Sequence, residues 1–233
     1  MPPGPLEQLR EGGKRAMAAA LARIEAGPGD PDTITLLEAA YANGEGHVIG
    51  LTGPPGVGKS TLIARMIEAF RRRDQTVGVI AIDPSSKRTG GALLGDRVRL
   101  ALDTEDHGIF VRSMAARGRL GGLANATYAA VVLMRAVYDW VIVETVGVGQ
   151  SETEIATVAD TVVLCVQPGS GDSLQYIKAG IAEIPDIAVV GKSDLGDVAL
   201  RTRADIKAAL ALEQRTDGWS VPVVSVSANK SLG

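Results

Sequence analysis

The residues with the clearest chemical potential form a glycine-rich stretch at residues 53–61, which reads Gly-Pro-Pro-Gly-Val-Gly-Lys-Ser-Thr. It matches the pattern Gly-x-x-x-x-Gly-Lys-Ser/Thr in full. Glycines allow backbone angles that turn successive N–H groups toward phosphate oxygens. The ammonium of Lys59 suits the β- and γ-phosphates of a nucleotide, and the Ser60 hydroxyl suits a magnesium ion. The stretch therefore predicts a nucleotide-binding phosphate loop formed by Gly53, Pro55, Gly56, Val57, Gly58, Lys59, Ser60 and Thr61.

Acidic residues near the ends of predicted strands are candidates for holding that magnesium ion. Asp83 follows one predicted strand and Glu144 ends another. Ligands bind at this edge of a parallel sheet, so ordinary solvated carboxylates are the less favoured interpretation for these two. For Asp96, the residue types alone leave both interpretations open. Glu144 also opens a Glu-x-x-Gly pattern, in which the Gly147 N–H is expected to donate to the γ-phosphate and to move after hydrolysis. Lys59, Glu144 and Gly147 are thus the candidate catalytic residues.

A second motif reads Gly-Lys-Ser-Asp from Gly191 onward and follows another predicted strand. Guanine recognition in GTPases uses Asn-Lys-x-Asp at this place. Asp194 would accept hydrogen bonds from N1 and N2 of guanine, a donor pair that adenine does not offer, and the Lys192 stem would pack along the ring. Gly191 stands where the pattern has asparagine. Ser227 and Ala228 follow the last predicted strand, where GTPases place a backbone contact to the guanine oxygen. A polar strand-to-helix turn is the alternative interpretation of the motif.

These motifs must be positioned by the surrounding chain, in which short β-rich runs alternate with helical ones from His47 onward. Most of the β-rich runs are continuously apolar, which is typical of strands buried on both faces of a parallel sheet. The alternation indicates an α/β fold with a mostly parallel sheet flanked by helices. Strands are expected at residues 47–52, 77–82, 108–112, 140–144, 161–166, 187–190 and 221–226. Helices are expected at residues 59–73, 123–138, 173–182 and 200–213.

A short helical segment precedes this fold. Each of two expected helices, one within the first 26 residues and one at residues 33–43, carries three apolar residues at helical spacing that are expected to pack together. They are Met17, Leu21 and Ile24 in the first helix, and Ile34, Leu37 and Tyr41 in the second. A break rich in glycine and proline separates the two. We therefore expect an N-terminal helical arm at residues 1–45 and a P-loop domain at residues 46–233.

Composition excludes several classes of function. The 233 residues include 24 basic and 27 acidic side chains, a net charge of −3. This balance provides no excess of positive charge to attract nucleic acid or an anionic membrane. No apolar run approaches the roughly 20 residues of a membrane helix, so we expect a cytoplasmic protein without a membrane partner. One cysteine and two histidines exclude a disulfide framework and a four-cysteine zinc site.

A third loop begins at Gln167 and reads Gln-Pro-Gly-Ser-Gly-Asp-Ser between a predicted buried strand and a predicted helix. Two glycines and a proline would let it move. Its composition alone better fits an ordinary strand-to-helix turn, with Ser170 or Asp172 as the helix cap.

Together these stretches resemble the MeaB/ArgK-type GTPases, the family of the methylmalonic aciduria type A protein. Its members chaperone adenosylcobalamin-dependent acyl-CoA mutases such as methylmalonyl-CoA mutase. The resemblance runs from about residue 8 to the end of the chain, and its most specific stretch is ETVGVGQSE at residues 144–152. The other matching stretches are GPPGVGKST, AIDPSSKRTGGALLGDRVRL, RGRLGGLA and QPGSGDSLQYIKAGI.

The resemblance implies the P-loop fold of the signal-recognition, MinD and BioD class, with GTP or GDP and magnesium as cofactors. It implies slow GTP hydrolysis that the partner accelerates, and a partner mutase whose cobalamin loading or protection is gated. A cobalamin adenosyltransferase is a further candidate partner. Ser60, Asp83, Asp96 and Glu144 would hold the magnesium ion, and residues 84–96 and 145–152 would be switches. The third loop would be an additional switch that signals to the mutase through Gln167, Gly169, Gly171, Asp172 and Lys178.

Two features depart from the family pattern: Gly191 replaces its asparagine, and the chain ends at Gly233, whereas members continue into C-terminal helices that help them dimerise. A homodimer is therefore left open. Two other functions are weighed. A nickel-insertion GTPase needs a cysteine and histidine site, and Cys165 falls inside a predicted buried strand. A small-molecule kinase usually needs an arginine-rich lid, whereas the arginines at 71–73 fit the solvated end of a helix.

Overall fold

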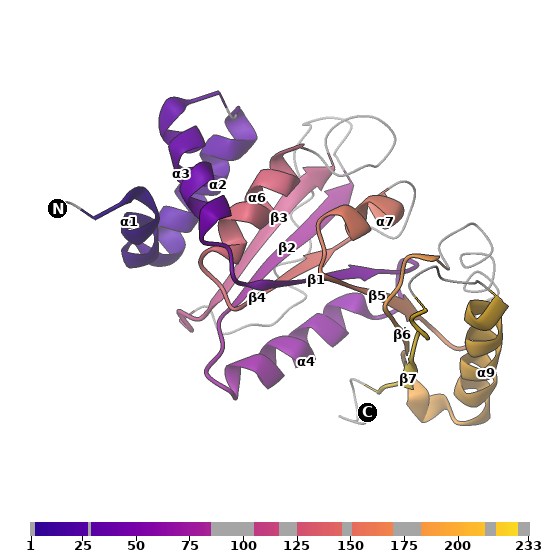
Figure 1. Ribbon diagram of the computed structural model, residues 1–233. Coiled ribbons are helices and arrows are strands. Elements are labelled where there is room, and N and C mark those ends of the chain that lie inside the picture. The colour runs from indigo at the N-terminus through magenta and orange to yellow at the C-terminus, as the bar shows by residue number, and fades with distance from the viewer. Residues whose placement is uncertain are drawn as a thin grey trace.

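The computed structural model describes residues 3–27, 29–84, 105–116, 125–145, 151–169, 183–212 and 218–227. Within them, seven parallel strands form one sheet in the order β3-β2-β4-β1-β5-β6-β7 (Figure 1). The strands are β1 His47–Thr52, β2 Val77–Pro84, β3 Ile109–Ala116, β4 Trp140–Glu144, β5 Thr161–Val166, β6 Ile187–Val190 and β7 Val223–Ser225. The predicted α/β fold is confirmed, and β1, β4, β5 and β6 have the expected bounds. β2 and β3 run further than expected, and β7 is shorter.

Helices cover both faces of the sheet (Figure 1). Helix α4, Lys59–Arg71, lies on one face, and its apolar side packs against side chains from β3 through β6. Helix α6, Asn125–Arg135, lies on the other face, and α9, Asp197–Leu212, packs there against the β5, β6 and β7 end. Strands covered in this way are buried on both sides, which explains their continuously apolar sequences. The helix expected at residues 173–182 lies outside the described residues. No described helix is long and apolar enough to span a membrane.

Three described helices precede β1, where two were expected. They are α1 Pro5–Glu11, α2 Gly13–Ala26 and α3 Pro31–Ala42. The chain turns between α1 and α2 at Gly13, whose φ of 56° lies in the left-handed region that favours glycine. Asp30 caps α3 by accepting a hydrogen bond from the Thr33 N–H at 3.1 Å.

The apolar face of α2 is the expected one, whereas that of α3 is the expected one only at Leu37, which packs against the core. Met17, Leu21 and Ile24 of α2 are buried. In α3 the buried apolar residues are Leu36 and Ala40, whereas Ile34 is 43% exposed and Tyr41 is 81% exposed. The predicted packing of Ile34 with Tyr41 is therefore wrong. Both sets of residues have helical spacing, and the packing of α3 against α1, α2 and α6 selects the buried one.

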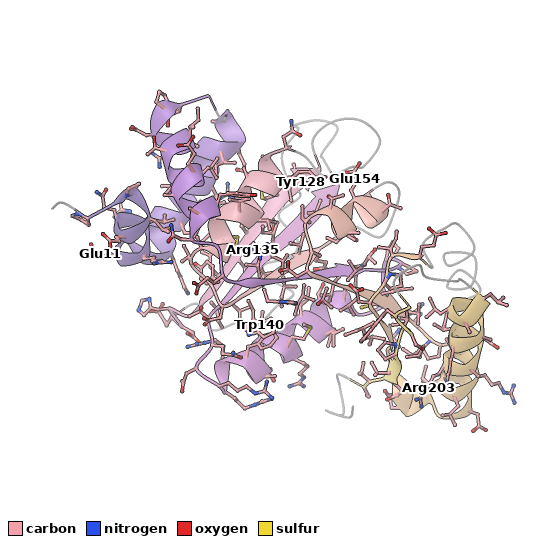
Figure 2. The ribbon with its side chains drawn as sticks, in the orientation of Figure 1. Glu11, Tyr128, Arg135, Trp140, Glu154 and Arg203 are labelled. Carbon is pink, nitrogen blue, oxygen red and sulfur yellow. The ribbon has the colours of Figure 1, made fainter. Side chains whose placement is uncertain are left out.

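Helix α6 joins the N-terminal helices to the sheet. Its last residue, Arg135 (labelled in Figure 2), donates from Nε to the Gly46 carbonyl at 3.0 Å, just before β1. Arg10 of α1 donates from Nε to the Ala136 carbonyl at 3.1 Å. The apolar core beneath α1, α2 and α3 is continuous with the core between α6 and the sheet.

Replacing Leu21 by alanine is expected to lower the free energy of unfolding by about 2–5 kcal/mol. Leu21 is fully buried in the core that α2 shares with α6, so the smaller side chain leaves a cavity. Urea denaturation of the whole chain measures the effect. The exposed Ile34→Ala is the control, with an expected change within about 0.5 kcal/mol. A Leu21→Ala chain as stable as the parent would show that the N-terminal helices do not support the core.

Candidate nucleotide site

The glycine-rich stretch forms a loop between the end of β1 and the start of α4. Gly53, Gly56 and Gly58 have φ values of 138°, 76° and 100°, which side chains rarely allow. A Cβ at Gly53 would also collide with the carbonyl oxygen of Cys165. Helix α4 begins at Lys59, so the N–H groups of its first turn, which have no partner within the helix, belong to the loop. Loop and helix end together form the kind of anion-binding site that phosphate groups occupy.

The Lys59 side chain is buried within this loop. Its Nζ donates to the Gly53 carbonyl at 2.7 Å and to the Pro54 carbonyl at 3.3 Å. Burying an ammonium is costly unless such partners accept its hydrogen bonds. The two carbonyls therefore fix a positive charge inside the loop that the glycines shape.

Ser60, on the first turn of α4, faces Glu144, the last residue of β4. The Ser60 Oγ donates to Glu144 Oε1 at 3.3 Å. In the sheet Glu144 pairs with Leu51, two residues before the loop begins, and this register brings residues 84 positions apart together. Hydroxyl and carboxylate oxygens are the hard ligands that Mg²⁺ prefers. The donor set of this pair therefore fits a magnesium ion.

Two buried threonines lie beside this pair, and the sequence motifs gave neither side chain a role of its own. Thr52 is the last residue of β1 and Thr145 follows β4. The Thr145 Oγ1 donates to Thr52 Oγ1 at 3.2 Å, and the Thr145 N–H donates to the Leu51 carbonyl at 3.0 Å. The contact ties the residue after Glu144 to the strand that leads into the loop. It depends on the pairing of β1 with β4, so no local sequence signal reveals it.

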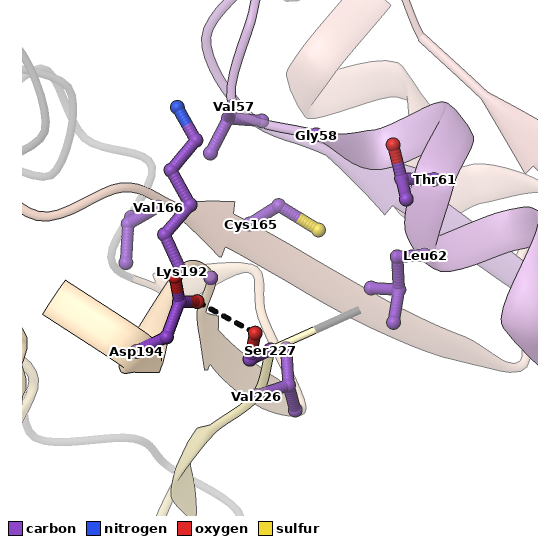
Figure 3. A pocket seen from close by; sticks show the side chains of 11 residues that line it. Val57, Gly58, Thr61, Leu62, Cys165, Val166, Lys192, Asp194, Val226 and Ser227 are labelled. Atoms are coloured by element: carbon purple, nitrogen blue, oxygen red, sulfur yellow. Dashed lines mark hydrogen bonds between the residues drawn. The ribbon is translucent and has the colours of Figure 1, made fainter. Parts of the chain in front are cut away.

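A pocket lies next to the glycine-rich loop, between α4 and the ends of β5, β6 and β7 (Figure 3). Lys192, Asp194 and Ser227 of the predicted base site line it, together with Val57 and Gly58 of the loop. The Ser227 Oγ donates to Asp194 Oδ1 at 2.6 Å. The fold thus brings together the two motifs that were predicted to bind phosphate and base.

Cys165, near the end of β5, forms part of the pocket wall. Its side chain is buried, and burial raises the pKa of the thiol to about 12. At neutral pH the thiol is therefore protonated and behaves as a small apolar group. His47 lies at the opposite end of β1, with Nε2 2.9 Å from Thr161 Oγ1. In the described part of the chain, no three His, Cys, Asp or Glu side chains are grouped to hold a metal ion.

Comparison with known proteins identifies the family. Residues 17–233 match the family model described as methylmalonyl Co-A mutase-associated GTPase MeaB. The chain belongs to the MeaB family. Its predicted P-loop fold and its assignment as a GTPase are thereby confirmed, and a GTPase binds guanine nucleotides.

Individual relatives agree with this assignment. A putative GTPase of Pyrococcus horikoshii is 44% identical over 233 residues, covering 98% of this MeaB-family chain and 73% of the relative. The mitochondrial methylmalonic aciduria type A homolog of Mus musculus is 41% identical over 190 residues, covering 79% of this chain and 46% of that protein. The crystal structure of LAO/AO transport system kinase superposes with a TM-score of 0.73 at 31% identity, covering 98% of this chain and 70% of that one.

The remaining predicted residues of this MeaB-family chain are placed only in part. Asp83 is in β2, two residues beyond Ala81, which pairs with Glu144, so its backbone lies at the same edge of the sheet. Gln167 directly follows β5, and Gly169 lies two residues further along the chain. The second predicted switch runs into a short helix, α7 Ser151–Glu154, which the sequence did not lead us to expect. Outside the described residues lie Asp96, Gly147, Gly171, Asp172, Lys178 and Ala228.

Arg71, which the kinase alternative would place in a lid, has a structural role instead. Its guanidinium binds Asp106 through two bonds, Nε to Oδ2 at 2.9 Å and Nη2 to Oδ1 at 3.0 Å, and this contact holds the pKa of the Asp106 carboxyl below its ordinary value. Arg71 ends α4, about 18 Å along the helix from Lys59 at 1.5 Å per residue. It anchors the far end of the helix, away from the nucleotide site.

Replacing Thr145 by valine is expected to lower the free energy of unfolding of this MeaB-family chain by about 1–2 kcal/mol. Valine keeps the shape of threonine but leaves the buried Thr52 hydroxyl without its partner. Chemical denaturation measures the change. Thr145→Ser keeps the hydroxyl and is expected to lose less stability than the valine variant. The reverse order of stability would refute a role for the hydroxyl pair.

Proposed function

We propose that this GTPase is the chaperone of an adenosylcobalamin-dependent acyl-CoA mutase and gates the loading or protection of its cobalamin. The observation that carries the proposal is the match of residues 17–233 to a family described as methylmalonyl Co-A mutase-associated. The similarity to a methylmalonic aciduria type A homolog supports it. A cobalamin adenosyltransferase is a second proposed partner, and the proposed location is the cytoplasm.

In this proposal, hydrolysis of GTP depends on position and charge. The Lys59 ammonium and the N–H groups of the loop would hold the phosphates, because all of them belong to the loop and the first turn of α4. Ser60 and Glu144 would hold a magnesium ion, with Asp83 and Asp96 as further proposed ligands. The ion would neutralise charge on the β- and γ-phosphates.

The pocket beside the loop is proposed to bind guanine. The Asp194 carboxylate would accept the N1 and N2 hydrogens of the base, and the Ser227 hydroxyl, 2.6 Å away, holds that carboxylate in place. Lys192 would lie along the ring, and Ala228 would contact the guanine oxygen. The loop from Gln167 to Lys178 is the proposed switch toward the mutase.

The test is co-purification of the full chain with candidate mutases, scored by the rate of phosphate release from GTP. The mutases acting on methylmalonyl-, isobutyryl-, ethylmalonyl- and hydroxyisobutyryl-CoA are the candidates. One of them is expected to bind and to raise the rate, and the increase should be absent in a Lys59→Ala chain. If none of the four binds or changes the rate, the proposed partner class is wrong. Phosphate release without any acceptor separates this hydrolase from a kinase.

A further inference from the structure

The loop that carries the proposed base site has an unusual backbone at Lys192. This residue has φ 51° and ψ 42°, a left-handed conformation that residues other than glycine seldom adopt. Its neighbours hold the turn on both sides, because the Gly191 N–H donates to the Val166 carbonyl and the Ser193 N–H donates to the Val226 carbonyl, both at 2.9 Å. Figure 3 shows the Lys192 side chain extended along the pocket beside Val57 and Val166. Strained backbone of this kind is typical of residues that position a ligand.

The far end of the same side chain is also held. The Lys192 Nζ donates to Gln167 Oε1 at 2.9 Å. Gln167 is the first residue after β5, and it follows Val166, which lines the pocket. The hydrogen bond is exposed to water, so it favours one orientation of the Lys192 side chain without locking it. In that orientation the apolar stem lies against one wall of the pocket before a ligand binds.

Gly191, the residue before Lys192, has space for a side chain that could make a second link to the site. Its φ is not positive, so the backbone would accept a side chain. A Cβ there would lie 3.4 Å from the Val57 carbonyl oxygen and 3.7 Å from that of Val166, which are ordinary contact distances. A side chain bearing an N–H would thus be close to the carbonyl of the phosphate loop, and glycine has none. In this chain, the Lys192 side chain links the Gly-Lys-Ser-Asp motif to the end of β5 through its hydrogen bond to Gln167.

We propose that Gln167 is a positioning residue of the nucleotide site, which holds Lys192 so that its stem is ready for the face of a bound purine. The proposal rests on the proposed guanine-binding role of this pocket. Every purine presents the same kind of ring face, whereas Asp194 meets the base edge that differs between purines. Gln167 therefore contributes to affinity for purine nucleotides in general, and Asp194 contributes the preference for guanine.

The test measures the dissociation constants of GDP and of IDP, which lacks the 2-amino group, by titration calorimetry on the whole chain. Gln167→Ala is expected to raise both constants by the same factor, about fivefold, because the lysine must then be ordered on binding. Asp194→Ala is expected to bring the two constants together, because it removes the acceptor for the 2-amino group. Gln8→Ala, an exposed glutamine on α1, is the matched control and should change neither constant.

Two rescue variants separate the hydrogen bond from a general loss of structure. Gln167→Glu keeps an acceptor for the ammonium and is expected to bind GDP at least as tightly as the parent. Gly191→Asn, added to Gln167→Ala, is expected to recover about threefold in affinity, because its amide supplies a donor for the Val57 carbonyl. An equal loss of GDP affinity in Gln167→Ala and Gln167→Glu would overturn the proposal. Failure of the asparagine to recover any affinity would overturn the idea that one link replaces the other.

The GDP dissociation constant of Asp194→Ala shows whether a failed prediction concerns the role of Gln167 or the base pocket itself. If Gln167→Ala leaves the GDP constant unchanged while Asp194→Ala raises it, the role of Gln167 is wrong and the base pocket stands. If neither variant changes the GDP constant, the base pocket itself is wrong, and the role of Gln167 is overturned with it.

Discussion

Replacing Lys59 by alanine is expected to lower the rate of GTP hydrolysis by about a thousandfold, which leaves no turnover above background in a phosphate-release assay. The ammonium is buried inside the loop by hydrogen bonds to the Gly53 and Pro54 carbonyls. We expect the ammonium to interact there with the charge that develops on the phosphates, at a position that the loop sets before hydrolysis begins. Alanine removes this charge and keeps a residue that favours the first turn of α4.

The control for this variant lies on the same helix. Arg65 pairs with Glu68 on the solvent side of α4, so Arg65→Ala removes a positive charge without approaching the loop. Its rate of hydrolysis is expected to equal that of the parent, and an exposed pair of this kind contributes little to stability. Unchanged turnover in Lys59→Ala, with α4 intact by circular dichroism, would remove Lys59 from the hydrolytic machinery.

Replacing Asp194 by asparagine is expected to weaken GDP binding by about a thousandfold and to strengthen binding of xanthosine diphosphate. Asparagine presents an N–H₂ group where the carboxylate presents an acceptor, so it opposes the N–H groups of guanine. Xanthine carries a carbonyl at C2, which the asparagine amide can satisfy. The Ser227 hydroxyl, which donates to Asp194 Oδ1, can donate to the amide oxygen and hold the new side chain in the same orientation.

Competition between GDP and xanthosine diphosphate for the purified chain measures this exchange of preference. Asp205→Asn on α9 makes the same chemical change on an exposed residue away from the pocket and should leave both affinities unchanged. If Asp194→Asn weakened both diphosphates equally, the carboxylate would be supporting the loop and not reading the base.

The strands near the site were predictable, because a strand buried on both faces has a continuously apolar sequence with turn residues at each end. Such runs set the bounds of β1, β4, β5 and β6 without help from tertiary structure. The phosphate loop was equally visible, since it needs glycine at Gly53, Gly56 and Gly58 for its positive φ values. These features depend on one short segment at a time.

Features that depend on two distant segments were not predictable in the same way. The contact of Thr52 with Thr145 requires the register of β1 against β4. The hydrogen bond between Gln167 and Lys192 joins the ends of β5 and β6, so composition led us to treat the two residues as parts of separate loops. In α3 two apolar faces were possible, and packing against α1, α2 and α6 buries Leu36 and leaves Ile34 exposed.

The way the apolar core is divided has a consequence for how the molecule melts. On the face opposite α4, one cluster lies under α1, α2, α3 and α6, and another lies under α9 at the β5, β6 and β7 end. The cluster under α4 extends from β3 to β6 and so contacts both halves. Cooperative unfolding requires contacts that distant parts share. Helix α4, which starts at the phosphate loop, therefore adds to the contacts that couple the two halves, together with Ile184, which packs against both clusters on the other face. Loosening α4 is expected to weaken this coupling, so that amide hydrogens at the α9 end exchange more readily.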